Sequence, residues 1–379
     1  MITLDTAQPI DDIPISEAEE KHLTASQWQL IWWRFRRHRA AMISMAVLVV
    51  LYTIALFAGF FAPHDPRDVV AEFADAPPQL PVFWDSAGVH FPPVVYSYVG
   101  ERDPRTLRKI YRLDSESRQP IRFLVRGEDY KLFGIVSTDI HFIGLDDPDQ
   151  PFFLLGTDSL GRDMLSRIIF GSQISLTIGL VGVFISLILG ILLGGISGYL
   201  GGWIDVGIQR LIEVLRSMPT IPLWLALSAA LPRNLNQVQI YFGITIILSL
   251  IGWTEIARVV RGKFMSLKHE DFILAARTNG TSRMRIIVVH MVPSFSSHLI
   301  AAMTLALPIM ILSETALSFL GLGLRPPIIS WGTLLEGTQN LDAIALTPWL
   351  LFPVVPVIIT VLAFNFIGDG LRDAADPYA

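Results

Sequence analysis

The sequence predicts an all-α polytopic membrane protein with six transmembrane helices and a small, partly β-structured extracytoplasmic insert. Apolar residues make up 52% of the 379-residue chain. Charged residues make up only 17%, whereas soluble domains carry roughly 25%. The mean hydropathy is +0.51. The apolar residues gather in blocks long enough to cross a hydrocarbon core, and the blocks are separated by charged segments rich in Arg and Lys.

The composition excludes several classes of protein. A disordered chain, a coiled coil and a nucleic-acid binder do not fit this hydropathy and a net charge of −5. The absence of cysteine excludes disulfides and thiolate metal sites. The sequence contains no Gly-x-x-x-x-Gly-Lys-Ser/Thr phosphate loop, no His-Glu-x-x-His and no Gly-x-Ser-x-Gly. We therefore expect a non-catalytic chain that binds no metal, no ATP and no other cofactor.

The N-terminal segment predicts a cytoplasmic tail at 1–39 and a first transmembrane helix at 40–62. Residues 40–62 carry no charge and are long enough to span the bilayer. The Arg-rich run 34–39 places the N-terminus in the cytoplasm by the positive-inside rule. A cleaved signal peptide is a poor alternative, because the apolar run starts too late and is too long.

Residues 63–155 predict an extracytoplasmic insert, because they follow the first crossing and are mostly polar. Segments 94–99, 121–125 and 131–136 are rich in β-branched and aromatic residues, which is typical of short strands. Docking of a receptor protein on this insert is a hypothesis only.

Five further membrane crossings are expected in a transmembrane core that covers 156–369. The second of them, which is the third span of the whole chain, is expected to kink at Pro219 and Pro222. They lie at 174–200, 204–231, 238–253, 293–319 and 347–367. Six crossings place both termini in the cytoplasm, with 370–379 as the C-terminal tail. They also place the basic segment 255–292 inside, which agrees with its charge.

The loop between the fourth and fifth predicted spans suggests two short helices. Glu270 and Asp271 suit the first turn of one helix, where carboxylates complement the helix dipole. Gly280 can adopt a positive φ and end that helix, and Thr281 or Ser282 can cap the next. Two short helices would form a rigid elbow able to transmit a push from a partner. An ordinary charged loop is the alternative.

Segment 268–293 resembles the coupling loop of binding-protein-dependent ABC importers. That loop has the pattern Glu-Ala-Ala, three residues, Gly, nine residues, Ile-x-Leu-Pro. Matching positions are Ala275, Ala276, Gly280 and Pro293, while Leu274, His290 and Val292 replace the Glu, Ile and Leu. These departures resemble the oligopeptide/dipeptide/nickel permease branch of the family, as do segments 155–171, 312–332 and 368–377.

The resemblance implies a type I ABC importer (MetI-like) core in a bacterial inner membrane. It implies a heterodimer with a sister permease, two cytosolic ATPase subunits that bind ATP and Mg, and an extracytoplasmic solute-binding protein. The solute would be a peptide, with nickel complexes and sugars left open. The residues expected to contact the ATPase are Glu270, Ala275, Ala276, Gly280, Arg285, His290 and Pro293. An ion-coupled secondary transporter is the alternative, but it predicts inverted repeats and charged residues at the membrane midplane.

Four residues are candidates for the translocation path or a gate: Glu314, Pro219, Arg162 and Asp163. Each also has a structural interpretation. Glu314 could hydrogen-bond a neighbouring helix, and Pro219 could be a packing kink. Segment 155–171 predicts an interfacial amphipathic helix that acts as a lid and in which Asp163 pairs with Arg167. A pair between Arg210 and Glu213 is also expected.

Overall fold

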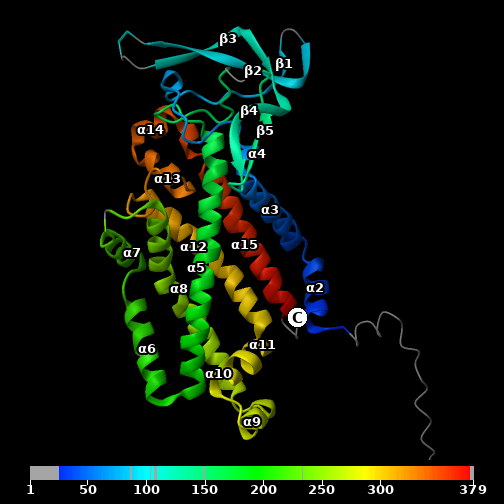
Figure 1. The fold of residues 1–379 in the computed structure, drawn as a ribbon, viewed down its shortest axis with the longest axis vertical. Coiled ribbons are helices and arrows are strands. Elements are labelled where there is room, and N and C mark those ends of the chain that lie inside the picture. The colour runs from blue at the N-terminus through cyan, green and yellow to red at the C-terminus, as the bar shows by residue number, and fades with distance from the viewer. Residues whose placement is uncertain are drawn as a thin grey trace, which may run out of the picture.

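The computed structural model describes residues 25–85, 88–102, 104–105, 109–147, 150–232 and 234–375. Most of the predicted N-terminal tail (1–24) and the last residues of the predicted C-terminal tail (376–379) lie outside the described residues. A bundle of long helices forms the body of the molecule, and a layer of strands covers one end of it (Figure 1).

Among the described residues, five helices are long and apolar enough to cross a membrane. They are α3 (Arg39–Leu56), α5 (Met164–Leu200), α8 (Gln237–Leu267), α12 (Ser296–Phe319) and the segment Pro348–Ala375 that contains α15 (Val354–Ala375). The shorter helices are α2 (Gln27–Arg37), α4 (Ala58–Phe61), α6 (Gly202–Ser217), α7 (Thr220–Ala229), α9 (Asp271–Thr278), α10 (Arg283–Arg285), α11 (Val292–Ser294), α13 (Trp331–Glu336) and α14 (Leu341–Leu346).

Helices α5 and α8 form the closest packed pair of the bundle. Ser249 of α8 donates a hydrogen bond to the Gly182 carbonyl of α5 at 3.0 Å. Further along, Gly198 lies directly against the Arg261 backbone. From the Gly182–Ser249 contact to the Gly198–Arg261 contact the residue numbers increase on both helices, so α5 and α8 run parallel. Small residues permit such close approach of helices in lipid, and Gly182 and Gly198 provide it here.

The predicted third span is divided into two helices. Helix α6 ends at Ser217, Met218 is extended (ψ 140°), and Pro219 precedes α7. A proline has no N–H to donate and disfavours helical geometry in the residue before it. The sequence predicted a kink here, and the structure shows a complete break. Figure 1 shows α6 and α7 one above the other along the edge of the bundle.

Other helix boundaries also differ from the prediction. Helix α3 ends at Leu56, and Phe57 separates it from the short α4, so 40–62 is not one helix. Helix α5 begins at Met164, which joins the predicted interfacial helix and the second span into one 37-residue helix. Residues 155–163 are a turn-rich segment rather than part of that helix.

The strands form two antiparallel groups. One is a three-stranded sheet in the order β1 (Val82–Asp85), β2 (Gly88–Arg102), β3 (Lys109–Pro120), and the other is a hairpin of β4 (Arg122–Leu132) and β5 (Val136–Gly144). The strands predicted at 94–99 and 121–125 fall almost wholly within β2 and β4. The strand predicted at 131–136 is wrong, because Phe133 and Gly134 have positive φ angles (52° and 71°) and form the hairpin turn.

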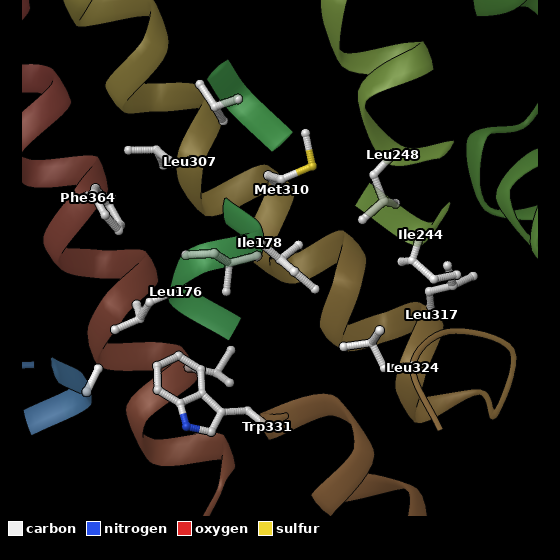
Figure 2. Close-up of a cluster of buried hydrophobic side chains, with 14 of the residues drawn as sticks. Leu176, Ile178, Ile244, Leu248, Leu307, Met310, Leu317, Leu324, Trp331 and Phe364 are labelled. Atoms are coloured by element: carbon white, nitrogen blue, oxygen red, sulfur yellow. The ribbon is translucent and has the colours of Figure 1, made fainter. Parts of the chain in front are cut away.

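The main hydrophobic core lies where α5, α8, α12 and α15 meet (Figure 2). Trp331, just after the loop that follows α12, is fully buried at the strand-bearing end of this core. Its indole N–H donates to the Ile168 carbonyl at 3.1 Å, which satisfies the polar atom of a large apolar side chain. The core therefore ties α13 to the start of α5.

We expect Gly194→Ala to destabilise the bundle by about 1–3 kcal/mol through overpacking. A Cβ at this position would lie 2.4 Å from the Ala257 carbonyl oxygen and 2.8 Å from its Cα, and backbone atoms cannot move aside. Gly262→Ala in α8 is the matched control, because a Cβ there meets nothing within 4 Å. Apparent melting temperatures in detergent test this. Equal melting temperatures for the two variants would contradict the packing described.

Candidate functional site

The C-terminal end of α9 is closed by a Schellman motif. Gly280 has φ +74° and donates its N–H to the Arg277 carbonyl at 3.0 Å. The N–H of Thr281 donates to the Ala276 carbonyl at 3.1 Å. This pattern satisfies carbonyls at the end of a helix and favours glycine at the positive-φ position. The predicted role of Gly280 as a helix terminator is confirmed.

The inner face of α9 is fixed to the bundle. Ile273 is completely buried and Ala276 is 9% exposed. Both belong to a hydrophobic cluster that includes Phe264 near the end of α8 and Phe295 at the start of α12. The elbow 268–293 is therefore packed against the ends of two long helices, and a force on α9 acts on both.

The outer face of α9 is exposed. Leu274, Ala275 and Arg277 are exposed, as are Glu270 and Asp271 at the start of the helix. The sequence pattern grouped Ala275 and Ala276 together, but the structure separates them into an outward and an inward residue. Of these two alanines, Ala275 is the one exposed to a partner.

The second half of the elbow is a continuous but irregular helix. The second short helix begins after Ser282, as expected, but Ser282 makes no side-chain capping bond, so the predicted cap is not formed. It continues as a π-helical segment (Ile286–Met291) and then α11, which contains the exposed Pro293. Arg285 is exposed and His290 is half-buried. The structure thus brings all seven predicted coupling residues into one segment, with differing exposure.

A basic cavity of about 330 Å³ adjoins the elbow. It lies between the C-terminal end of α5 and the elbow, and it is lined by Tyr199, Leu200, Arg277, Thr281, Arg283 and Ile286. The elbow, α2 and the C-terminal end of α15 are all at one end of the molecule, and the strands are at the other (Figure 1).

At the strand-bearing end, Asp158 organises the segment before α5. Its carboxylate accepts hydrogen bonds from the Leu160 and Arg162 backbone N–H groups at 2.9 and 3.0 Å. It also forms ion pairs with Arg162 (2.7 Å) and Arg167. Asp158 is 6% and Arg167 is 8% exposed. The sequence analysis missed Asp158, although its spacing of four residues from Arg162 was a usable signal.

The predicted pair between Asp163 and Arg167 is wrong. Asp163 is the N-cap of α5 and accepts from the Ser166 N–H at 2.7 Å, whereas Arg167 pairs with Asp158. An acidic N-cap satisfies a free helix donor and suits the helix dipole. Asp163 is buried, so its observed position is structural.

The segment 155–163 also ties the strand-bearing part to the bundle. The Thr157 N–H donates to the Ala76 carbonyl and the Asp75 N–H donates to the Asp158 carbonyl, both at 2.9 Å. The indole of Trp349 donates to the Thr157 carbonyl at 2.8 Å. The segment is therefore a three-way junction rather than a free lid.

An open cavity of about 920 Å³ lies beside this junction. Its polar lining comes from Asp75, Lys109, Asp158, Arg162 and Glu336, among others. Arg162 faces this cavity, but Asp163 does not line it. The two residues that the sequence grouped as a gate therefore have different environments.

Electrostatics also hold the β4–β5 hairpin to the junction. The side chains of His64 and Glu128 approach to 3.9 Å, and the Asp65 N–H donates to Glu128 at 3.0 Å. The interaction with His64 lowers the pKa of Glu128 to about 2. Burial of the His64 ring opposes its protonation, yet Glu128 and Asp163 raise its pKa above the ordinary value. Both shifts favour a charged pair.

Glu314 lies at the centre of a separate buried network. It is fully buried and accepts hydrogen bonds from Ser318 and Ser330 at 2.8 Å and from Ser175 at 3.4 Å. Ser175 in turn accepts from the Trp331 N–H at 3.0 Å. The network links α5, α12 and α13. Pro219 belongs to a different element, so the four predicted gate residues do not form one site.

Within the described ranges, no group of three or more His, Asp or Glu side chains is placed to hold a metal ion. The molecule is instead defined by long apolar helices and a rigid elbow at the end opposite the strands. That combination defines a polytopic membrane protein.

Two family models match the chain. Residues 186–378 match the model described as "Binding-protein-dependent transport system inner membrane component", and residues 26–78 match "N-terminal TM domain of oligopeptide transport permease C". The first match covers just over half of the chain and includes the whole elbow. The chain belongs to the binding-protein-dependent transport family of inner-membrane components and is a multi-pass membrane protein.

Similar proteins carry related names. The oligopeptide transport system permease protein OppC of Bacillus subtilis is 37% identical over 238 residues, which cover 62% of this chain and 75% of that protein. The dipeptide transport system permease protein DppC of Lactococcus lactis is 29% identical over 93% of this chain and 91% of that protein. A solved structure of the MetNI methionine ABC transporter aligns with a TM-score of 0.44 at 19% identity, covering 56% of this chain and 97% of that one.

We expect Asp158→Ala to destabilise the protein by about 3–5 kcal/mol, because it leaves the buried Arg167 guanidinium without its partner. Asp146→Ala is the control. It removes an exposed ion pair with Arg122 (3.1 Å), which is expected to be worth less than about 1 kcal/mol. The apparent melting temperature of each variant measures the difference. A similar small decrease for both would contradict the structural role of Asp158.

Proposed function

We propose that this chain is the transmembrane permease subunit of an ABC importer for peptides. Family membership and the peptide-transport names of its relatives support this assignment. Among the described contacts, one observation carries the coupling mechanism: the inner face of α9 is packed against the ends of α8 and α12. A partner that grips the exposed face of α9 would move both helices together.

The chain crosses the membrane six times in this proposal. Helices α5 and α8 are parallel, so the segment between them has to return to the other side of the bilayer. Helices α6 and α7 together supply 26 residues for that return, 16 and 10 respectively. A break in a membrane-spanning segment is tolerated only where protein or water satisfies the free backbone groups. The break at Pro219 therefore favours a position of this segment next to a partner chain or the translocation path.

The elbow lies in the cytoplasm in this arrangement, with both termini on the same side. The basic residues of 255–292 support that orientation. A cytosolic ATPase binds the elbow on each of two permease subunits, and ATP and Mg are held by the ATPases alone. The sister permease is a related chain, and an extracytoplasmic solute-binding protein delivers the peptide to the end that bears the strands.

Transport then follows from a shift between two conformations. ATP binding draws the ATPases together, and the elbows transmit this movement to α8 and α12. A ligand shifts such an equilibrium only through its different affinity for the two states. The packed elbow supplies the mechanical link, whereas a flexible loop would absorb the movement.

We expect Ala275→Trp to release the ATPase while leaving the permease folded, because Ala275 is exposed on the outer face of α9. Ala276→Trp is the matched comparison and is expected to lower the melting temperature as well, because Ala276 packs inside the elbow cluster. Co-purification of the ATPase and the melting temperature are measured together. Retention of the ATPase by Ala275→Trp, or peptide uptake driven by a proton gradient without any ATPase, would contradict the proposal.

We propose that Glu314 positions α13 rather than contacting the solute. Glu314→Gln keeps the size and one acceptor oxygen, so uptake is expected to stay close to that of the unchanged protein. Glu314→Leu is expected to cost about 1–3 kcal/mol for each serine left without a partner. Peptide uptake in vesicles and melting temperature separate the two effects. A loss of uptake in Glu314→Gln with intact ATPase assembly would assign Glu314 to the pathway instead.

A further inference from the structure

The β4–β5 hairpin extends from the strand-bearing end towards α4 and the end of α3 (Figure 1). Its turn is formed by Phe133, Gly134 and Ile135. The ring of Phe133 lies 5.5 Å from the ring of Phe57, edge to face, and Phe57 is the residue directly after α3. The turn therefore lies beside the outer end of a membrane-spanning helix.

The hairpin is held firmly in this position. His141 of β5 contacts the Ala62 carbonyl at 2.6 Å and the Glu128 carbonyl at 2.9 Å through its two ring nitrogens. The Tyr130 ring packs against Gly59 of α4 so closely that a Cβ there would lie 2.3 Å from the ring. These contacts fix the position of the turn relative to α3 and α4.

The side chains of the turn are apolar and unusually exposed. Ile135 is 85% and Phe133 is 56% exposed. Two backbone donors of the turn are satisfied within the hairpin, because Gly134 N–H donates to the Lys131 carbonyl at 3.3 Å and Ile135 N–H to the Leu132 carbonyl at 3.1 Å. These internal bonds reduce the cost that keeps most loops out of hydrocarbon, and the remaining backbone groups of the turn can face the polar headgroup region.

The turn continues the lipid-facing surface of α3. That helix exposes Ile43, Val49, Val50 and Leu56 along its length. Its 18 residues rise by about 27 Å, close to the roughly 30 Å of a hydrocarbon core. Because α3 starts at Arg39, its other end at Leu56 lies at the outer edge of the core. Phe133 contacts Phe57 directly after α3, so the apolar side chains of the turn, Phe133 and Ile135, adjoin the outer end of this exposed apolar surface.

From this geometry we propose that the turn Phe133–Ile135 inserts its side chains into the outer leaflet of the bilayer and anchors the strand-bearing part to the membrane surface. Aromatic and aliphatic side chains are typical of such interfacial contacts. Lys131, exposed at the end of β4, can extend its ammonium to the lipid headgroups. The anchor is independent of the transported solute and of the ATPase.

Nitroxide labelling tests this directly, because the chain has no native cysteine. The variant Ile135→Cys is labelled in the full-length chain and reconstituted into phosphatidylethanolamine–phosphatidylglycerol vesicles. Val49→Cys on α3 serves as the lipid-exposed reference and Leu113→Cys on β3 as the water-exposed one, since both native side chains are exposed. Power saturation compares collision rates with oxygen, which partitions into lipid, and with a water-soluble nickel chelate.

We expect the logarithm of the oxygen-to-nickel ratio to be positive at 135, as at 49, and negative at 113. A negative value at 135 would show that the turn lies in water and would overturn the proposal. Low collision rates with both reagents at 135 would show that another protein surface covers the turn, which would overturn it equally.

Discussion

The parallel contact between α5 and α8 is the constraint on which the rest of the architecture depends. Glycines on α5 let the backbones approach until Ser249 hydrogen-bonds the Gly182 carbonyl. In lipid there is little hydrophobic force between helices, so close packing and such hydrogen bonds supply the association. Because the two helices are parallel, the segment between them has to run the other way, which is the course of α6 and α7.

The same pair connects the two ends of the molecule. At one end, Asp158 and Arg167 fix the start of α5 to the junction with the strands. At the other end, a Cβ on Gly195 of α5 would lie 2.8 Å from the Phe264 ring of α8, and Phe264 belongs to the cluster that holds α9. A displacement of the elbow therefore reaches a helix that runs the full length of the bundle.

Asp158 and Glu314 illustrate how buried acids are used in this fold. Asp158 is neutralised by two arginines, and Glu314 is surrounded by three serine hydroxyls. The Asp158 network fixes the segment before α5 to the first turn of that helix, whereas the Glu314 network joins α5, α12 and α13. A buried polar group costs free energy unless it is hydrogen-bonded, so these networks favour one arrangement of the elements over alternatives.

The sequence by itself determined the hydrophobic helices, the side of the membrane expected for the basic loop, and the end of α9 at Gly280. These features depend on local composition and on backbone preferences of single residues. Only the tertiary structure decided the start of α5 at Met164, the partner of Arg167, the hairpin turn at Phe133 and the difference between Ala275 and Ala276. The burial of Ala276 depends on the ends of α8 and α12, which lie in other parts of the chain. The other three features are local: the N-cap at Asp163, the ion pair of Arg167 with Asp158 nine residues earlier, and the positive φ angles at Phe133 and Gly134. Several local arrangements fit the same residue pattern, and the packed structure selects one of them.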